Sequence, residues 1–244
     1  MENQLIDACK NGNVDEVKRF LKEPNINLNS QDESEDGAFN IACQERHIEI
    51  VKLLLNDNRV DVNKPDYRGA TSFWIACQNS DIEIVKLLSN NERVDVNQVE
   101  DKYERTPFYI ACQNGHVEVV EMLLNIEKVD INKAESGGET PFYKACEYGH
   151  LEIVKCILAS DKEILLHKKS HNHQKTALDI SKERSASTQS YPFESKEVYQ
   201  KAKKNCPLIV ELLESFQKNP SEIKLITRNE VKYRMFIYFL SQTS

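Results

Sequence analysis

Thr-Pro-Phe-Tyr-Ile-Ala-Cys-Gln-Asn-Gly-His-Val-Glu-Val-Val, residues 106–120, is the stretch of sequence that decides the fold. Threonine suits the position that caps a helix, and the proline after it suits the first helical turn. The glycine before the histidine permits a left-handed turn, and apolar residues then return at helical spacing. The stretch therefore predicts a short helix, a tight turn and an amphipathic second helix.

The same pattern recurs along the chain at intervals of 34 or 35 residues. Its recurring alanines are Ala8, Ala42, Ala76, Ala111 and Ala145. Six residues after each alanine a second amphipathic segment begins, such as Ile48-Glu49-Ile50-Val51. A unit of this size cannot bury its own apolar face, so neighbouring units must stack against each other. The period therefore predicts an array of helical repeats.

Thr140-Pro141 and Tyr148-Gly149-His150 repeat the signature of residues 106–120, and with it the chain resembles the ankyrin repeat family. The resemblance implies an all-α solenoid of about six helix–turn–helix repeats with β-hairpin-like connectors and a C-terminal capping helix. Two repeats depart from the family pattern, because Arg46-His47 and Ser80-Asp81 stand where Gly-His is usual. We expect the fold to tolerate both departures.

The repeats set the expected domain boundaries. An ankyrin repeat domain is expected over residues 1–219, with repeats near 3–32, 37–66, 71–101, 106–135, 140–171 and 176–219. The last repeat starts at Thr176, but its second helix is expected only at Leu208, after an insertion over residues 182–205 in which Ser195 could start a short helix.

Residues 220–244 are expected to form a helix that caps the stack, because terminal repeats need their outer face covered. Tyr233, Phe236, Ile237 and Leu240 fall on one face of this helix. Docking or dimerisation through the same helix is the alternative.

Composition and charge exclude several classes of protein. A formal net charge of −7 opposes binding to nucleic acid, and neither a secretory signal nor an apolar run of 18 residues is present. The number of cysteines, seven, is odd, which favours a reducing compartment over a secreted disulfide framework, and the absence of a CxxC pair speaks against zinc and thioredoxin-type sites. We expect a cytoplasmic protein with no membrane insertion.

The thiols and imidazoles are expected to be structural, so we expect neither an enzyme nor a cofactor. Five cysteines occupy one repeat position that needs a small buried residue. They are Cys9, Cys43, Cys77, Cys112 and Cys146. His47, His116 and His150 share a turn position in the same way. The cluster of His167, His171 and His173 reads as a solvated connector without the further donors that a metal needs.

The resemblance implies a partner protein or peptide held on the concave side by the connector tips and the first helices. Carried over position by position, the expected contact residues are Tyr67, Arg68, Gln78, Asn79, Lys102, Tyr103, Arg105, Gln113, Asn114, Glu139, Glu147 and Tyr148. Tyrosine and arginine commonly supply the energy of such interfaces. The expected function is that of a monomeric, non-catalytic adaptor or scaffold. Self-association through the C-terminal helix is the alternative.

Trp74, Tyr109 and Tyr143 form a separate aromatic row at one repeat position, where the family usually has histidine. Stacking between repeats and contact with a partner are both open for this row.

Overall fold

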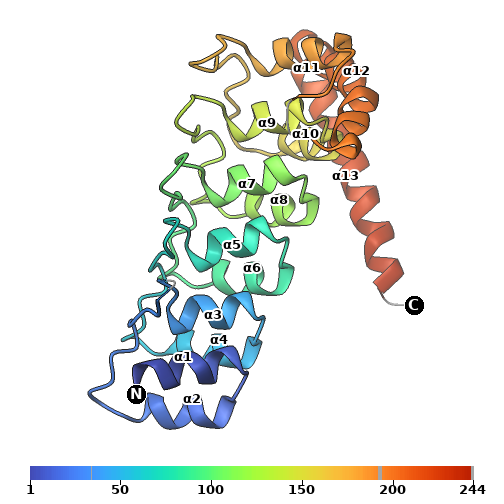
Figure 1. Cartoon of the computed structure of the whole chain (residues 1–244). Helices are drawn as coiled ribbons and strands as arrows, with labels where there is room; N and C mark the ends of the chain where they lie inside the picture. Colours follow the sequence, from blue (N-terminus) through green and yellow to red (C-terminus); the bar gives the residue numbers. More distant parts are fainter. Residues whose placement is uncertain (34, 192–193, 243–244) are drawn as a thin grey trace. The chain divides into compact units, whose positions relative to one another are not determined.

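The computed structural model describes residues 1–33, 35–191 and 194–242, with side chains of the last helix described up to Arg234. The chain divides into two compact units, Met1–Pro107 (unit 1) and Phe108–Ser244 (unit 2), and each is treated by itself. Figure 1 shows the helices of both units as successive antiparallel pairs. These pairs confirm the predicted all-α repeat fold.

In unit 1 the helix pairs are α1 (Glu2–Lys10) and α2 (Val14–Leu21), α3 (Ala38–Gln44) and α4 (Ile48–Asn56), and α5 (Ser72–Gln78) and α6 (Ile82–Ser89). The first helices stack as α1 on α3 on α5, and α2 packs on α4. The small residues at the recurring alanine position allow this close approach, since Ala42 is fully buried. Ile84, Val85 and Leu88 of α6 are also fully buried, and each such aliphatic side chain contributes about 1.5–3 kcal/mol.

In unit 2 the helices are α7 (Pro107–Asn114), α8 (Val117–Leu124), α9 (Pro141–Glu147), α10 (Leu151–Ala159), α11 (Ala177–Ala186), α12 (Lys196–Lys218) and α13 (Pro220–Gln242). Helix α11 packs on α9, and α10 packs on α8. Thr140 caps α9 by accepting a hydrogen bond from the amide of Tyr143, with Pro141 at the start of the helix, as the threonine–proline pair predicts.

The connectors turn back on themselves through backbone hydrogen bonds. The amide of Asp66 donates to the carbonyl of Ala70 at 2.9 Å, and the amide of Glu135 donates to the carbonyl of Glu139 at 3.1 Å. An isolated antiparallel bridge joins Gln31 to Gly37 in the first connector. These turns are hairpin-like, and no strand forms in the described residues.

In the last repeat, the segment between the two helices is shorter than the predicted insertion over residues 182–205. Helix α11 continues to Ala186, and α12 begins at Lys196 instead of Leu208, so only residues 187–195 separate the two helices. Ser195 caps α12, and the helix continues through Pro207. The reason lies in packing. Residues 202, 206, 209 and 213 are all buried on one helical face, which offsets the hydrogen bond that the proline removes.

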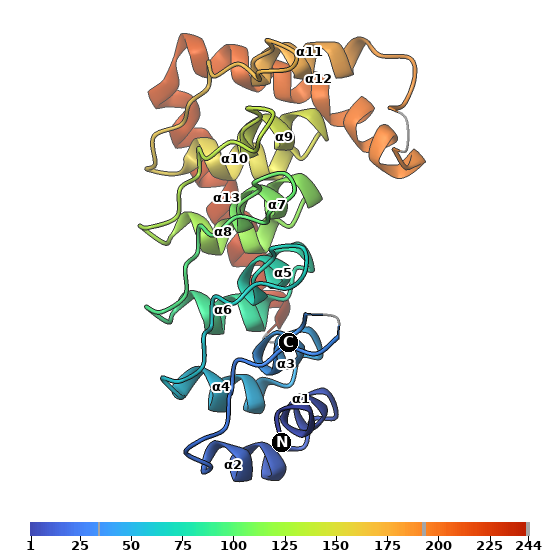
Figure 2. The ribbon, with the colours of Figure 1, turned by 60° about the vertical axis from the view of Figure 1, so that its left-hand side comes forward.

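The position of helix α13 also differs from the prediction of a cap on the outer face of the stack. The helix packs on α10 and α12 instead. Figures 1 and 2 both show it running back from the end of α12 past α10. Ion pairs hold it there, since Glu230 pairs with Lys155 at 2.7 Å and Arg234 pairs with Glu152 at 2.8 Å. Tyr233 is 69% exposed. The side chains of Phe236, Ile237 and Leu240 lie outside the described residues.

No helix in the described part of the chain is both long enough and apolar enough to span a membrane.

Candidate functional site

The connector between α4 and α5 is built around one buried carboxylate. Asp66, which is 5% exposed, accepts hydrogen bonds from the amides of Arg68 and Ala70, both at 2.9 Å. Its other oxygen accepts two bonds from the guanidinium of Arg68, at 2.9 Å from Nε and 2.7 Å from Nη2. Backbone and side-chain donors therefore fix the tip, and the negative charge is neutralised locally.

The next connector repeats this construction with a glutamate. Glu100, which is 3% exposed, accepts from the amides of Lys102 at 2.9 Å and Tyr103 at 3.0 Å. Arg105 donates to the same carboxylate at 2.8 Å. The two connectors touch, since the amide of Asp101 donates to the carbonyl of Arg68 at 3.2 Å. Five of the predicted contact residues therefore lie on adjoining turns of unit 1 that buried carboxylates hold by hydrogen bonds.

We call these five residues, Tyr67, Arg68, Lys102, Tyr103 and Arg105, the tyrosine tips. Tyr67 is 65% exposed and Tyr103 is 40% exposed, and cations lie over both rings. Arg68 is 5.5 Å from the centroid of Tyr67, and Arg105 is 4.6 Å from that of Tyr103. These contacts restrict the rings, so a partner that meets them loses less side-chain entropy on binding.

Gln78 and Asn79 close α5 in the same unit, where Gln78 is half-buried and Asn79 is exposed. Trp74, in the same helix, is 3% exposed and donates from its indole nitrogen to the carbonyl of Arg105 at 2.8 Å. Tyr109 and Tyr143 are buried as well. Burial favours the packing role for this aromatic row over contact with a partner.

The predicted contact residues of unit 2 have different surroundings. Glu139 and Glu147 both pair with Lys144, at 2.5 Å and 2.7 Å, and Glu147 is only 8% exposed. Burial alone would lower the pKa of Lys144, but the two carboxylates raise it above its ordinary value. Tyr148 is half-buried, with Lys144 5.8 Å from its ring centroid. Glu139 and Glu147 are therefore less accessible to a partner than exposed carboxylates, since their side chains are only 12% and 10% exposed and are paired internally.

Gln113 and Asn114 end α7 in unit 2. Gln113 is half-buried and its carbonyl accepts from the imidazole Nε2 of His150 at 2.9 Å. Asn114 is exposed.

Histidines join neighbouring repeats within each unit. The Nε2 of His47 donates to the carbonyl of Lys10 at 3.1 Å, as His150 does to Gln113. Each ring covers a glycine with positive φ, and a Cβ on Gly12 or Gly115 would lie 2.8 Å or 2.6 Å from it. We call this arrangement the glycine–histidine pair. It supports the structural role predicted for His47 and His150.

Burial lowers the pKa of His150 to about 4, because the folded protein disfavours its charged form. Between that value and about 6.5, the unfolded chain binds a proton that the folded chain does not, so stability falls as pH falls through this window. At pH 5 we expect the free energy of unfolding of unit 2 to be about 2 kcal/mol lower than at pH 7 from this group alone. Urea unfolding of the natural chain and of His150→Gln at both pH values measures it. Equal losses in the two proteins would contradict the assignment.

All seven cysteines are free and buried. Burial raises the pKa of Cys206 to about 11 and that of Cys9 and Cys156 to about 12, so these thiols stay protonated near neutral pH. His171 packs against Gly138, and its amide donates to the carbonyl of Gly137 at 2.8 Å, which gives this histidine a place in the connector. Within the described residues, no three His, Cys, Asp or Glu side chains are grouped to hold a metal ion.

Sequence reasoning missed Asp66 and Glu100, although these residues shape the tyrosine tips. The signal was present, since an acidic side chain recurs at the equivalent position of four connectors. These residues are Asp32, Asp66, Glu100 and Glu135. Asp32 likewise accepts from the amide of Asp36 at 3.0 Å. Aligning the connectors as well as the helices would have identified the set.

The comparisons with known proteins agree with this architecture. A family model for ankyrin repeats in three copies matches residues 5–100 and 73–169. No curated protein matches the chain. Among solved structures, the ankyrin repeat protein EF0377 is similar, with a TM-score of 0.68, 21% identity, and coverage of 85% of this chain and 98% of that one. An ankyrin repeat domain from Acinetobacter baumannii is also similar, with a TM-score of 0.68, 20% identity and the same two coverages. The family model spans well over half of the sequence, and the chain therefore belongs to the ankyrin repeat family.

Proposed function

We propose that this protein is a binding module that holds a folded protein or an extended peptide, and that the tyrosine tips of unit 1 are its main contact surface. Ankyrin repeats are generally protein–protein interaction modules. The observation that carries the proposal is the pair of exposed tyrosines, Tyr67 and Tyr103, on turns fixed by buried carboxylates. A rigid aromatic surface of this kind is typical of interface hot spots.

The proposal gives different weights to the other predicted contact residues. Asn79 is exposed at the end of α5 and is included as a secondary contact, together with Gln78. In unit 2, Asn114 and Tyr148 keep a secondary role, with Gln113 beside them. Glu139 and Glu147 are the weakest members of the set, because both are already paired with Lys144 and little exposed.

Removing both tyrosine rings is expected to weaken partner binding by at least 30-fold. Truncation of one hot-spot residue costs about 2 kcal/mol or more, which is the origin of this factor. Partners are first captured with the intact chain. The affinity of the captured partners is then measured by titration for the intact chain and for Tyr67→Ala/Tyr103→Ala. Because both rings are exposed, the thermal unfolding midpoint should change little.

Tyr233→Ala is the matched control, since Tyr233 is an exposed tyrosine on α13 in the other unit. It should leave binding unchanged. Recovery of the same partners with the same affinity by the double variant would show that the tyrosine tips are not the contact surface. A loss in Tyr233→Ala alone would instead favour a contact through α13.

A further inference from the structure

The junction between the second and third repeats lacks both members of the glycine–histidine pair. Arg46 takes the place of the glycine, with φ of 58°, and Asp81 takes the place of the histidine. The Nε of Arg46 and a carboxylate oxygen of Asp81 are 2.8 Å apart. An aspartate is shorter than a histidine and its carboxylate has no proton to donate, so it does not replace the imidazole contact.

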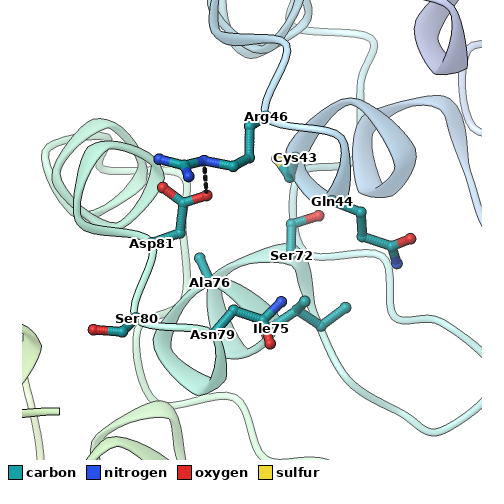
Figure 3. A pocket seen from close by; sticks show the side chains of 9 residues that line it. All are labelled: Cys43, Gln44, Arg46, Ser72, Ile75, Ala76, Asn79, Ser80 and Asp81. Carbon is teal, nitrogen blue, oxygen red and sulfur yellow. Dashed lines mark ion pairs between the residues drawn. The ribbon is translucent and has the colours of Figure 1, made fainter.

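A cavity of about 260 Å³ lies at this junction, the junction cavity. Its lining includes Cys43, Gln44, Ser72, Ala76, Asn79 and Asp81. Figure 3 shows Arg46 and Asp81 facing each other on one side of this space, with Cys43 and Ser72 on another side. All of these residues belong to unit 1.

Polar groups in the lining have unused hydrogen-bonding capacity. The side chain of Ser72 is 1% exposed, and its hydroxyl makes no hydrogen bond of normal geometry to any described residue. Its polar neighbour is the thiol of Cys43, which is a weak partner. Asp81 is 9% exposed and accepts from Arg46 and, at 3.4 Å, from the amide of Ile84. A carboxylate has about four lone-pair sites, so Asp81 has room for a further donor.

The size of the junction cavity limits its occupant. Sites for drug-sized ligands usually measure about 300–1,000 Å³, so this one suits a single side chain or a molecule of similar size.

Charge then selects a cation. Residues 1–107 contain 13 Lys and Arg against 21 Asp and Glu, a net charge of −8 that repels a carboxylate and attracts a basic group. The positive charge of Arg46 is offset by its ion pair with Asp81, and its side chain is 64% exposed, so it opposes a cation less than a buried, unpaired charge would. A guanidinium is more weakly hydrated than an ammonium and offers five donors in one plane. That donor set matches the hydroxyl of Ser72 and the carboxylate of Asp81, whose oxygen atoms can accept further hydrogen bonds.

We propose that the junction cavity binds the guanidinium group of an arginine side chain presented by the protein partner. The source of the arginine rests on the proposed function. Binding of the guanidinium group itself does not.

The test is a titration of the full chain with n-butylguanidinium at low salt, followed by two-dimensional amide NMR. The expected result is saturable shifts at Ser72, Ala76 and Asp81. Asp81→Asn keeps the size of the side chain and its role as helix cap, but removes the charge, and should weaken binding at least tenfold. Arg46→Gly/Asp81→His restores the glycine–histidine pair, fills the space and should abolish the saturable shifts. Its thermal unfolding midpoint should equal or exceed that of the natural chain.

Absence of saturable shifts in the natural chain would overturn the proposal, as would an affinity in either variant equal to that of the natural chain. Equal affinity for n-butylammonium would overturn the choice of arginine over lysine. None of these results depends on the tyrosine tips, because the probe needs no protein partner. A loss of partner capture in Tyr67→Ala/Tyr103→Ala therefore leaves this titration unaffected.

Discussion

Changing Glu194 to alanine is expected to lower the free energy of unfolding of unit 2 by about 3–5 kcal/mol, the usual cost of breaking a buried ion pair from one side. Glu194 pairs with Arg184, and their side chains are only 4% and 1% exposed. Arg184 also donates to the carbonyl of Glu147 at 3.3 Å, and its guanidinium lies 4.2 Å from the ring centroid of Tyr191. The variant leaves that guanidinium buried without its carboxylate. Denaturant unfolding, with hydrogen exchange in α9 and α11, measures the loss.

Glu183→Ala is the matched control for this prediction. Glu183 pairs with Lys175, but the two side chains are 44% and 35% exposed, and exposed pairs contribute about 0–1 kcal/mol. A second test replaces both buried partners, as Arg184→Met/Glu194→Met. If orphaned charge causes the loss, the double variant recovers most of it. A double variant as unstable as Glu194→Ala would show that shape, and not charge, is responsible.

The repeats could be predicted from the sequence because each one carries its own local signals. Thr140 and Pro141 start α9 where the pattern predicts, and His47 and His150 reach back to the preceding repeat as equivalent positions should. The buried alanines and cysteines recur with the same period of 34 or 35 residues. Any feature that recurs with the repeat was therefore open to prediction, including the acidic residues of the connectors that were overlooked.

The end of the chain could not be predicted in the same way, because its structure depends on contacts between distant residues. The apolar run at Leu208 predicts a second helix that starts there, whereas Ala202 and Cys206, which precede Leu208, are already buried within α12. The place of α13 depends on pairs such as Arg234 with Glu121. Such pairs have no period, so the repeat gives no information about them.

The sequence predicts where the tyrosine tips lie, but it does not predict which residues hold them in place. Tyr67 and Tyr103 could be assigned to connector tips from the family pattern. The buried carboxylates of Asp66 and Glu100 that hold those tips were not assigned, since acidic residues in a polar loop usually read as solvated. In unit 2 the family pattern predicts Glu147 on the contact surface, whereas its side chain is buried beside Lys144.

Gly149→Ala should lower the free energy of unfolding of unit 2 by about 3 kcal/mol, from a strained backbone and an overpacked contact together. Gly149 has φ of 68°, and a Cβ there would lie 2.6 Å from the Cα of Ala202. At Gly115 the neighbour is a histidine ring, but at Gly149 it is the backbone of α12, which cannot rotate away. The side chain of Asn205 fixes this contact by donating to the carbonyl of Gly149 at 2.8 Å.

Gly137→Ala is the control, since the atoms nearest to its Cβ would be the ends of two side chains, those of Glu135 and Asn172, and the variant should lose less than about 1 kcal/mol. Urea unfolding of both variants makes the comparison. At Gly149 the backbone of α12 occupies the place that an imidazole takes at Gly12 and Gly115. The size of the loss in Gly149→Ala therefore also tests whether α12 begins at Lys196, because only then is the backbone of Ala202 held in the helix. A helix that began only at Leu208 would leave Ala202 free to move, and Gly149→Ala would then lose only the roughly 1–2 kcal/mol that the positive φ costs.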